Sequence, residues 1–279
     1  METDVIVLDS NDHGESDVIL TLFARHEGRV RAIAKGGRKS LRRFVNKLEP
    51  FSFLHVVCRR KSPGALAFLA EAELHSAFFN IRNDLELYTV ASVIQEFLLI
   101  AIKDEQPDER IFRLSLWSLH HLDQQHTPRA VLALFLIRFF EYLGYRPDLE
   151  HCGGCRRAVT ATAQCHFHPE WGALVCTHCR SAVTVTTPLS PGAVKVLRVA
   201  QHLPLERLDR LRLSGPMLQE ALTMLHQYGR NLFQRDIVSW RQLRRTPRPV
   251  AKPAASDDSA RLQRNPAPTG ALTIKEEHI

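Results

Sequence analysis

The chain has 279 residues, 44% of them hydrophobic, with a formal net charge of +7 and a pI near 9.3. This length holds one large domain or two ordinary ones with a real core, and the basic balance favours an anionic partner, with nucleic acid the leading candidate. We expect a cytoplasmic protein, because residues 1–8 do not read as a signal peptide and the longest apolar run, 130–137, is far short of the ~20 residues that span a bilayer.

The first part of the chain has the pattern of β-strands. Val30, Ala32 and Ala34 alternate with cationic residues, which places an apolar face inward and the charges outward on one strand. Several short strands separated by turn residues predict a small barrel, and an OB-type barrel, which often binds nucleic acid, suits their number and spacing. The predicted strands lie at 5–8, 18–23, 30–35, 51–57 and 65–70.

A basic stretch covers residues 25–61, where twelve Lys and Arg residues stand against only Glu27 and Glu49. A solvated surface is the alternative, but charge this concentrated and one-signed favours a groove that follows a phosphate backbone. Phe44 is a candidate for base stacking, although a core position is more typical of such a residue. The predicted DNA-binding residues are Arg29, Arg31, Lys35, Arg38, Lys39, Arg42, Arg43 and Lys47.

From Asn83 onward the apolar period changes to that of helices. Asp84 is placed to cap a helix over 85–101, Pro107 opens a second that ends near 120–121, and Pro128 opens a third that runs to Gly144 and is apolar nearly all round. Further helical patterns cover 189–202, 216–233 and 236–245, so we predict an all-α domain. The composition of 246–279 predicts a disordered tail.

Arg138 interrupts the most apolar of these helices. A guanidinium there must reach the surface or find a carboxylate. An internal ion pair with Glu141, three residues on, and a role in binding a partner are both open at this point.

Two Cys-x-x-Cys motifs, Cys152 with Cys155 and Cys176 with Cys179, indicate one zinc site. Four thiolates complete a tetrahedral shell, so the zinc is expected to be structural, and the lack of a secretory signal argues against disulfides. Gly153 and Gly154 are expected to give the first turn its backbone freedom. Nearby residues that could replace one cysteine are Cys165, His151, His166, His168 and His178.

A metal-dependent nuclease that carries a zinc ribbon is the alternative class of function. It needs clustered carboxylates for magnesium or an open metal site, and the chain offers two acidic groups, at 9–17 and 104–109. The first falls in or beside a turn and the second flanks a helix start, where acidic residues are common for structural reasons. We therefore predict a protein that is not an enzyme.

Several short motifs resemble one family when they are taken together. They are Gly14-Glu15-Ser16-Asp17, Leu22-Phe23, Glu27-Gly28, Lys35-Gly36-Gly37-Arg38-Lys39-Ser40, Leu48-Glu49-Pro50-Phe51, Arg138-Phe139-Phe140-Glu141, Leu143-Gly144-Tyr145, Pro147 and Cys152-x-x-Cys155. In this order and spacing they are similar to the bacterial DNA repair protein RecO family, over roughly residues 1–245.

The resemblance implies an α+β fold: an OB-fold β-barrel domain at 1–80, then an all-α domain at 81–245 with an inserted four-cysteine zinc loop at 150–181. It also implies a nucleoid-associated recombination mediator that binds single- and double-stranded DNA, anneals strands, and with RecR loads recombinase onto DNA covered by single-strand-binding protein. The family engages the acidic, apolar-ended tail of that protein through its helical domain, which makes Arg138, helped by Arg129, the candidate clamp for the tail's carboxylate.

Overall fold

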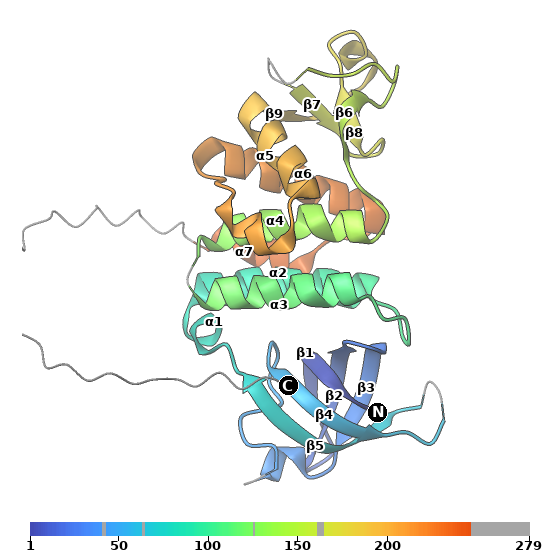
Figure 1. Ribbon diagram of the computed structural model, residues 1–279, viewed down its shortest axis with the longest axis vertical. Helices are drawn as coiled ribbons and strands as arrows, with labels where there is room; N and C mark the ends of the chain where they lie inside the picture. Colours follow the sequence, from blue (N-terminus) through green and yellow to red (C-terminus); the bar gives the residue numbers. More distant parts are fainter. Residues whose placement is uncertain (41–42, 63–64, 125, 161–164, 247–279) are drawn as a thin grey trace, which may run out of the picture. The chain divides into compact units, whose positions relative to one another are not determined.

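A computed structural model describes residues 1–40, 43–62, 65–124, 126–160 and 165–246 (Figure 1). The predicted tail at 246–279 lies outside these residues except for Thr246. The described residues belong to one compact unit, Met1–Thr246.

The N-terminal strands form a closed five-stranded barrel in the order β1-β2-β3-β5-β4. β3 and β5 are parallel and the other neighbours are antiparallel, so the predicted OB-like barrel is confirmed. β1 runs past the predicted end at Leu8, because it pairs with β2 up to the tip of their hairpin, where His13 faces Asp17. The strands are β1 (Glu2–His13), β2 (Asp17–Ala24), β3 (Gly28–Ala34), β4 (Phe53–Arg59) and β5 (Ala67–Ser76).

The barrel interior is filled by the alternate residues that the sequence pattern predicts. Val30, Ala32 and Ala34 of β3 are buried, and Arg31 is exposed on the outer face. Small residues face each other where β3 meets β5, at Ala32 and Ala67. Phe44, in the segment between β3 and β4, is only 3% exposed and packs in the barrel core, as expected for a core residue.

Seven α-helices follow the barrel in the described part of the chain. Asp84 caps α2 as predicted, since its carboxylate accepts the backbone N–H groups of Glu86 and Leu87 at 2.8 and 2.9 Å. The N-cap of α3 is Asp108, one residue beyond the predicted opening at Pro107. The helices are α1 (Phe79–Asn83), α2 (Leu85–Ala101), α3 (Glu109–Asp123), α4 (Pro128–Tyr142), α5 (Pro191–His202), α6 (Gly215–Phe233) and α7 (Val238–Arg245).

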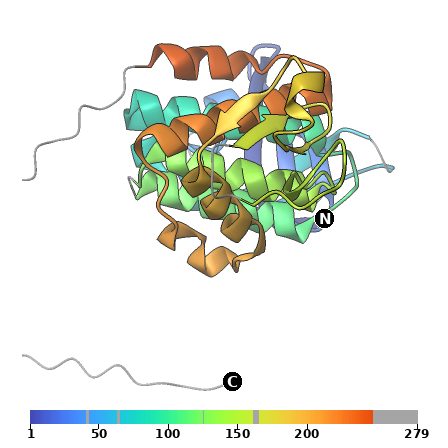
Figure 2. The same cartoon turned by 90° about the horizontal axis from the view of Figure 1, so that it is seen from above.

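α4 is the central helix of this part. Every residue from Val131 to Phe140 is buried, because α2, α3, α5 and α6 all pack against it. α7 lies along α2 (Figure 2), where the Glu96 carboxylate accepts the backbone N–H groups of Val238 and Ser239, both at 2.8 Å. The ring of His226 on α6 stacks on Trp240 of α7 with centroids 4.4 Å apart. None of the helices in the described residues has the length and hydropathy needed to cross a membrane.

The barrel joins the helices through the segment between α2 and α3. Gly28 has a left-handed φ of 71°, and a Cβ at this position would lie 2.5 Å from the backbone oxygen of Gln106. Only glycine adopts this φ without strain and also leaves room for the backbone of Gln106. Phe23 of the barrel also packs edge-on against Phe112 of α3, with ring centroids 5.3 Å apart.

Between α4 and α5 the chain forms a small sheet that the sequence analysis did not predict. Its order is β6-β8-β7-β9, and β6 runs parallel to β8. The sheet rests on the helices through Phe167, which meets Tyr228 of α6 edge-on at 5.7 Å. Its strands are β6 (Asp148–Cys152), β7 (Cys165–His168), β8 (Ala173–Val175) and β9 (Thr187–Leu189).

Candidate nucleic-acid interface and metal centre

The small sheet brings the two cysteine motifs together. β6 ends at Cys152 and β8 ends one residue before Cys176, and because the two strands are parallel their carboxyl ends meet at one edge. The sulfur atoms of Cys152, Cys155, Cys176 and Cys179 all lie within 4.8 Å of one another. Cys155 Sγ and Cys176 Sγ are 3.7 Å apart. Sulfurs bound tetrahedrally at ~2.3 Å from one zinc ion lie about 3.8 Å apart, so the donor set fits a metal ion.

The glycines of the first motif have a different role from the one expected. Neither Gly153 nor Gly154 has a positive φ; the left-handed residue of this turn is Arg156, with φ 63°. A Cβ on Gly153 would lie 3.0 Å from Trp171, and one on Gly154 would lie 3.3 Å from Cys179 Sγ. Gly154 therefore allows close packing of the two knuckles, and Gly153 allows Trp171 to pack against the first knuckle; neither supplies an unusual backbone conformation.

The surroundings of the thiols favour a bound cation. Burial raises the pKa of Cys152, but the backbone N–H groups of Cys176, Cys155 and Gly154 outweigh it and lower the pKa to about 6. Burial, followed by hydrogen bonds that the Cys179 thiol donates to the other three sulfurs, raises the pKa of Cys179 to about 12. Thiolates so close together repel one another, and a divalent cation removes that repulsion. The four cysteines of the two motifs form no disulfide in the described structure, so the disulfide alternative has no support there.

The residues considered as substitute ligands lie apart from this cluster in the described part of the chain. Cys165 is buried in the core as part of β7. His166 contacts the hydroxyl of Thr186 at 3.2 Å, and His168 stacks on Trp171 with centroids 4.5 Å apart. His151 lies 3.4 Å from Asp148, and His178 is exposed. The four knuckle cysteines are the set that the geometry favours.

Some of the predicted DNA-binding residues are paired with a carboxylate or a backbone oxygen, and others have no carboxylate partner in the described residues. Lys35 pairs with Asp17 at 2.6 Å and Arg38 pairs with Asp12 at 3.2 Å, yet both side chains stay more than half exposed. Lys47 donates to the backbone oxygen of Ala72 at 2.7 Å. Arg42 lies outside the described residues.

Arg31, Lys39 and Arg43 are exposed, and no carboxylate lies within ion-pair distance of them in the described residues. Arg43 donates to the backbone oxygen of Lys35 at 2.8 Å, and its guanidinium lies over the ring of Phe44 at 4.5 Å. We call these three residues the open cations. They lie on β3 and on the segment between β3 and β4.

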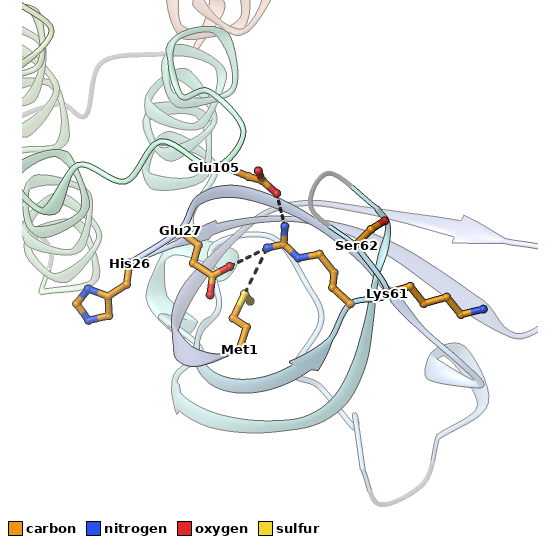
Figure 3. A pocket seen from close by; sticks show the side chains of 7 residues that line it. Met1, His26, Glu27, Lys61, Ser62 and Glu105 are labelled. Atoms are coloured by element: carbon orange, nitrogen blue, oxygen red, sulfur yellow. Dashed lines mark hydrogen bonds and ion pairs between the residues drawn. The ribbon is translucent and has the colours of Figure 1, made fainter.

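Other arginines of the basic stretch face the helices. Arg29 pairs with Asp104 at 2.6 Å and Arg25 with Glu109 at 2.6 Å. Arg60 pairs with Glu27 at 2.7 Å and with Glu105 at 2.5 Å. Figure 3 shows the side chains of Glu27 and Glu105 pointing toward one guanidinium. The acidic residues that flank the start of α3 therefore hold the barrel to the helices, and Arg29 is engaged there in the described structure.

The acidic group near the β1–β2 hairpin is engaged in a similar way. A hydrogen bond from Lys35, followed by one from the backbone N–H of Gly36, holds the pKa of Asp17 below its usual value. Asp9 accepts the side-chain amide of Asn11 at 2.7 Å. These carboxylates accept hydrogen bonds from neighbouring barrel groups, which is the structural role that acidic residues often have in turns.

Phe68 was missed by the sequence reasoning. It is 36% exposed on the outer face of β5, opposite Ile33 of β3 and Arg59 of β4. The sequence did carry a signal for this position: Ala67 and Leu69 are buried, and the alternation of side chains along a strand then places Phe68 on the outer face. An exposed aromatic ring beside an arginine is a candidate surface for base stacking.

The two predicted partner-binding arginines both have internal contacts. Arg138 is 8% exposed and donates to the backbone oxygens of Ala200 and Gln201, at 3.3 and 2.5 Å, which caps the end of α5. It also lies 3.5 Å from Glu141, the ion pair considered from the sequence. Arg129 pairs with Glu86 at 2.8 Å. Neither contact tests a role in binding a partner.

Comparisons with known proteins give a consistent result. Residues 1–78 match the family model "Recombination protein O N terminal", and residues 82–241 match "Recombination protein O C terminal". The chain is 33% identical over 210 residues to a DNA repair protein RecO of Syntrophobacter fumaroxidans, with 75% of this chain and 83% of the relative covered. It is 33% identical over 231 residues to the protein of that name from Desulfatibacillum aliphaticivorans (81% and 89% covered) and 28% identical over 228 residues to that from Bacillus pumilus (82% and 87% covered).

Proposed function

The chain belongs to the RecO family of bacterial DNA repair proteins, and from that premise we propose that it is a DNA-binding recombination mediator and not an enzyme. In this proposal it anneals complementary strands and, together with RecR, loads recombinase onto single-stranded DNA covered by single-strand-binding protein. We also propose the division into a barrel domain at 1–80, a helical domain at 81–245 and a tail at 246–279.

The observation that carries the proposal is the set of open cations on the barrel. Arg31, Lys39 and Arg43 are exposed without a carboxylate partner in the described residues, so their charge is available to an anion. Lys35 and Arg38 stay more than half exposed beside their partners and can exchange a carboxylate for a phosphate. Five such cations on one barrel suit a phosphate backbone, which is bound through charge and with little dependence on base sequence.

Phe68 adds a contact of a different kind. A base that stacks on an exposed ring must be unpaired, so this residue favours single strands over duplex. Arg59 faces Phe68 across β4 and β5 and can neutralise the phosphate beside a stacked base. A surface that holds the backbone and leaves base edges unread is compatible with annealing, because those edges remain free to pair with a second strand.

We propose that Cys152, Cys155, Cys176 and Cys179 bind one structural Zn²⁺. The four thiolates would close its coordination shell, and the ion would join the ends of β6 and β8. The DNA-binding barrel is a separate set of strands, so the ion supports the fold of the helical part and does no chemistry on DNA.

Binding of the single-strand-binding protein tail through Arg138 and Arg129 remains a proposal. Arg138 would have to release the end of α5, and Arg129 would have to release Glu86, before either could hold a terminal carboxylate. A carboxylate ligand could compensate for those contacts, because charge-assisted pairs with arginine are strong.

Strand annealing tests the proposed function. The purified chain is mixed with two complementary single strands in the presence of a chelator for magnesium and without nucleotide, and duplex formation is followed by fluorescence quenching. We expect faster annealing than in the absence of protein. A nuclease would instead shorten the strands, and only when a metal is added; cleavage of that kind, or no annealing at any protein concentration, would refute the proposal.

A further inference from the structure

A second cluster of metal-ligating side chains lies on the outer wall of the barrel, far along the chain from the cysteines. Asp4 of β1, His55 of β4 and His75 of β5 each offer one ligand atom, and these atoms lie within 4.8 Å of one another. We propose that this cluster is a divalent transition-metal site that joins three strands of the barrel and takes Zn²⁺ in preference to Mg²⁺ or Ca²⁺. The proposal is independent of DNA binding.

The strand register explains how the three residues meet. Asp4 and His55 are direct partners across the β1–β4 ladder. On the other side of β4, Leu54 pairs with Leu74 and Phe53 with Ser76, so His75 is the extra residue of a β-bulge. Bulges re-aim side chains in this way and occur often beside functional sites.

The distances fit a common ion. Asp4 Oδ1 lies 2.9 Å from His55 Nδ1 and 3.4 Å from His75 Nε2. Ligand atoms held about 2.1 Å from one zinc ion are about 2.9 to 3.4 Å apart at octahedral or tetrahedral angles. Two imidazoles and a carboxylate form a donor set of borderline softness, which suits Zn²⁺, Cu²⁺ or Ni²⁺ better than magnesium or calcium.

Groups around the cluster orient its ligands. The other ring nitrogen of His55 lies 3.4 Å from Glu2 Oε1, the carboxylate–histidine arrangement that commonly supports a metal ligand. Arg25 approaches the second oxygen of Asp4 at 3.7 Å and leaves Oδ1 to the histidines. The ring of His75 lies on Phe53 with centroids 4.8 Å apart.

The local charge also favours a dication. Glu2, Asp4 and Glu109 lie at the site or beside its neighbour Arg25, so three carboxylates stand against one guanidinium. The ligand side chains are 26–40% exposed, which leaves an ion access from solvent and room for water in the remaining coordination positions. Such a site should bind its ion more weakly and release it faster than the four cysteines.

Zinc stoichiometry of the full chain tests the site. Equilibrium dialysis against Zn²⁺ with excess Mg²⁺ should give about two ions per chain for the unaltered protein and about one for the double variant His55→Ala with His75→Ala. The matched control changes two exposed barrel histidines outside the cluster, His13→Ala with His26→Ala, and should still bind about two. Loss of a direct ligand should weaken the second site by more than the 10–100-fold that is typical of changes to supporting residues.

A spectroscopic measurement separates this site from the cysteines. Cu²⁺ added to protein that holds one zinc ion per chain, at the tighter four-cysteine site, should show an electron paramagnetic resonance spectrum with coupling to imidazole nitrogen and no thiolate charge-transfer band. The milder variant His75→Gln, at the partly exposed bulge, should lose this signal and replaces the double variant if that does not fold. Saturation at one zinc ion in the unaltered protein, or a second ion that survives loss of both histidines, would overturn the proposal.

Discussion

Removal of the open cations should change the salt dependence of DNA binding by a predictable amount. Five exposed cations of the barrel, Arg31, Lys35, Arg38, Lys39 and Arg43, give about five phosphate contacts. Each contact to a single strand contributes about 0.7 to the negative slope of log affinity against log salt, so the unaltered protein should show a slope of roughly −3.5. Replacing Arg31, Lys39 and Arg43 by Ala should leave about two contacts and a slope near −1.4.

The assay is fluorescence anisotropy of a labelled single strand at several salt concentrations. Between 50 and 200 mM salt, affinity should fall by about 100-fold for the unaltered protein and by less than about 10-fold for the triple variant. Arg207, Arg210 and Arg212 supply the control: they are exposed, lie outside the barrel, and remove the same net charge when changed to Ala. An unchanged slope in the barrel variant, or an equal loss of slope in the control, would refute the placement of DNA on this surface.

Four further outcomes are expected. Phe68→Ala should weaken single-strand binding by about 1 to 3 kcal/mol with an unchanged salt slope, whereas Phe68→Tyr, which keeps the ring, should bind normally in the same anisotropy assay. Cys176→Ser should lower the zinc content measured by elemental analysis, and it should expose the 150–181 loop to protease while the barrel stays folded. A zinc content equal to that of the unaltered protein would contradict the four-cysteine site. Arg138→Ala should lower the free energy of unfolding, measured in urea, by about 2 to 4 kcal/mol, because the last carbonyl groups of α5 lose their hydrogen bonds to the guanidinium. An unchanged free energy of unfolding would show that these contacts contribute little. Burial, followed by the nearby charges of Arg244 and Arg230, lowers the pKa of His226 from 6.5 to about 4. The free energy of unfolding should therefore not depend on this group above pH 6.5, and should fall by about 3 kcal/mol as the pH falls to 4, because the unfolded chain takes up the proton first. His226→Phe should flatten that part of the curve of unfolding free energy against pH measured in urea, and an unaltered curve would contradict this expectation.

The parts of the fold that sequence reasoning recovered are those set by neighbours along the chain. Alternation of Val30, Ala32 and Ala34 marks a strand because side chains on a strand alternate between its two faces. Asp84 marks a helix start because its carboxylate reaches N–H groups two and three residues on. The four cysteines were identifiable as a set because metal coordination restricts residue type and spacing.

Contacts between distant residues were beyond such reasoning. Arg29 and Asp104 lie 75 positions apart in sequence, and no local pattern indicates that this arginine, which was predicted to bind DNA, pairs with a carboxylate of the segment between α2 and α3. β8 and β9 have three residues each, too few to show a period, so the sheet that positions the cysteines was not predicted. The meeting of Asp4, His55 and His75 depends on a bulge, which composition does not reveal.

Synthesis on the ribosome imposes an order on the cysteine centre. Cys152 and Cys155 emerge before the 20 residues at 156–175 that separate them from the second motif, and β6 has no parallel neighbour until β8 is made. At ~5–20 residues per second, this interval lasts about 1 to 4 seconds. During that time the two early thiols lack the sulfurs that would complete their shell, and free thiolates are the forms that oxidants attack. We therefore expect nascent chains to be more vulnerable to oxidation at this centre than finished chains in which the proposed zinc ion binds all four sulfurs at the β6–β8 edge.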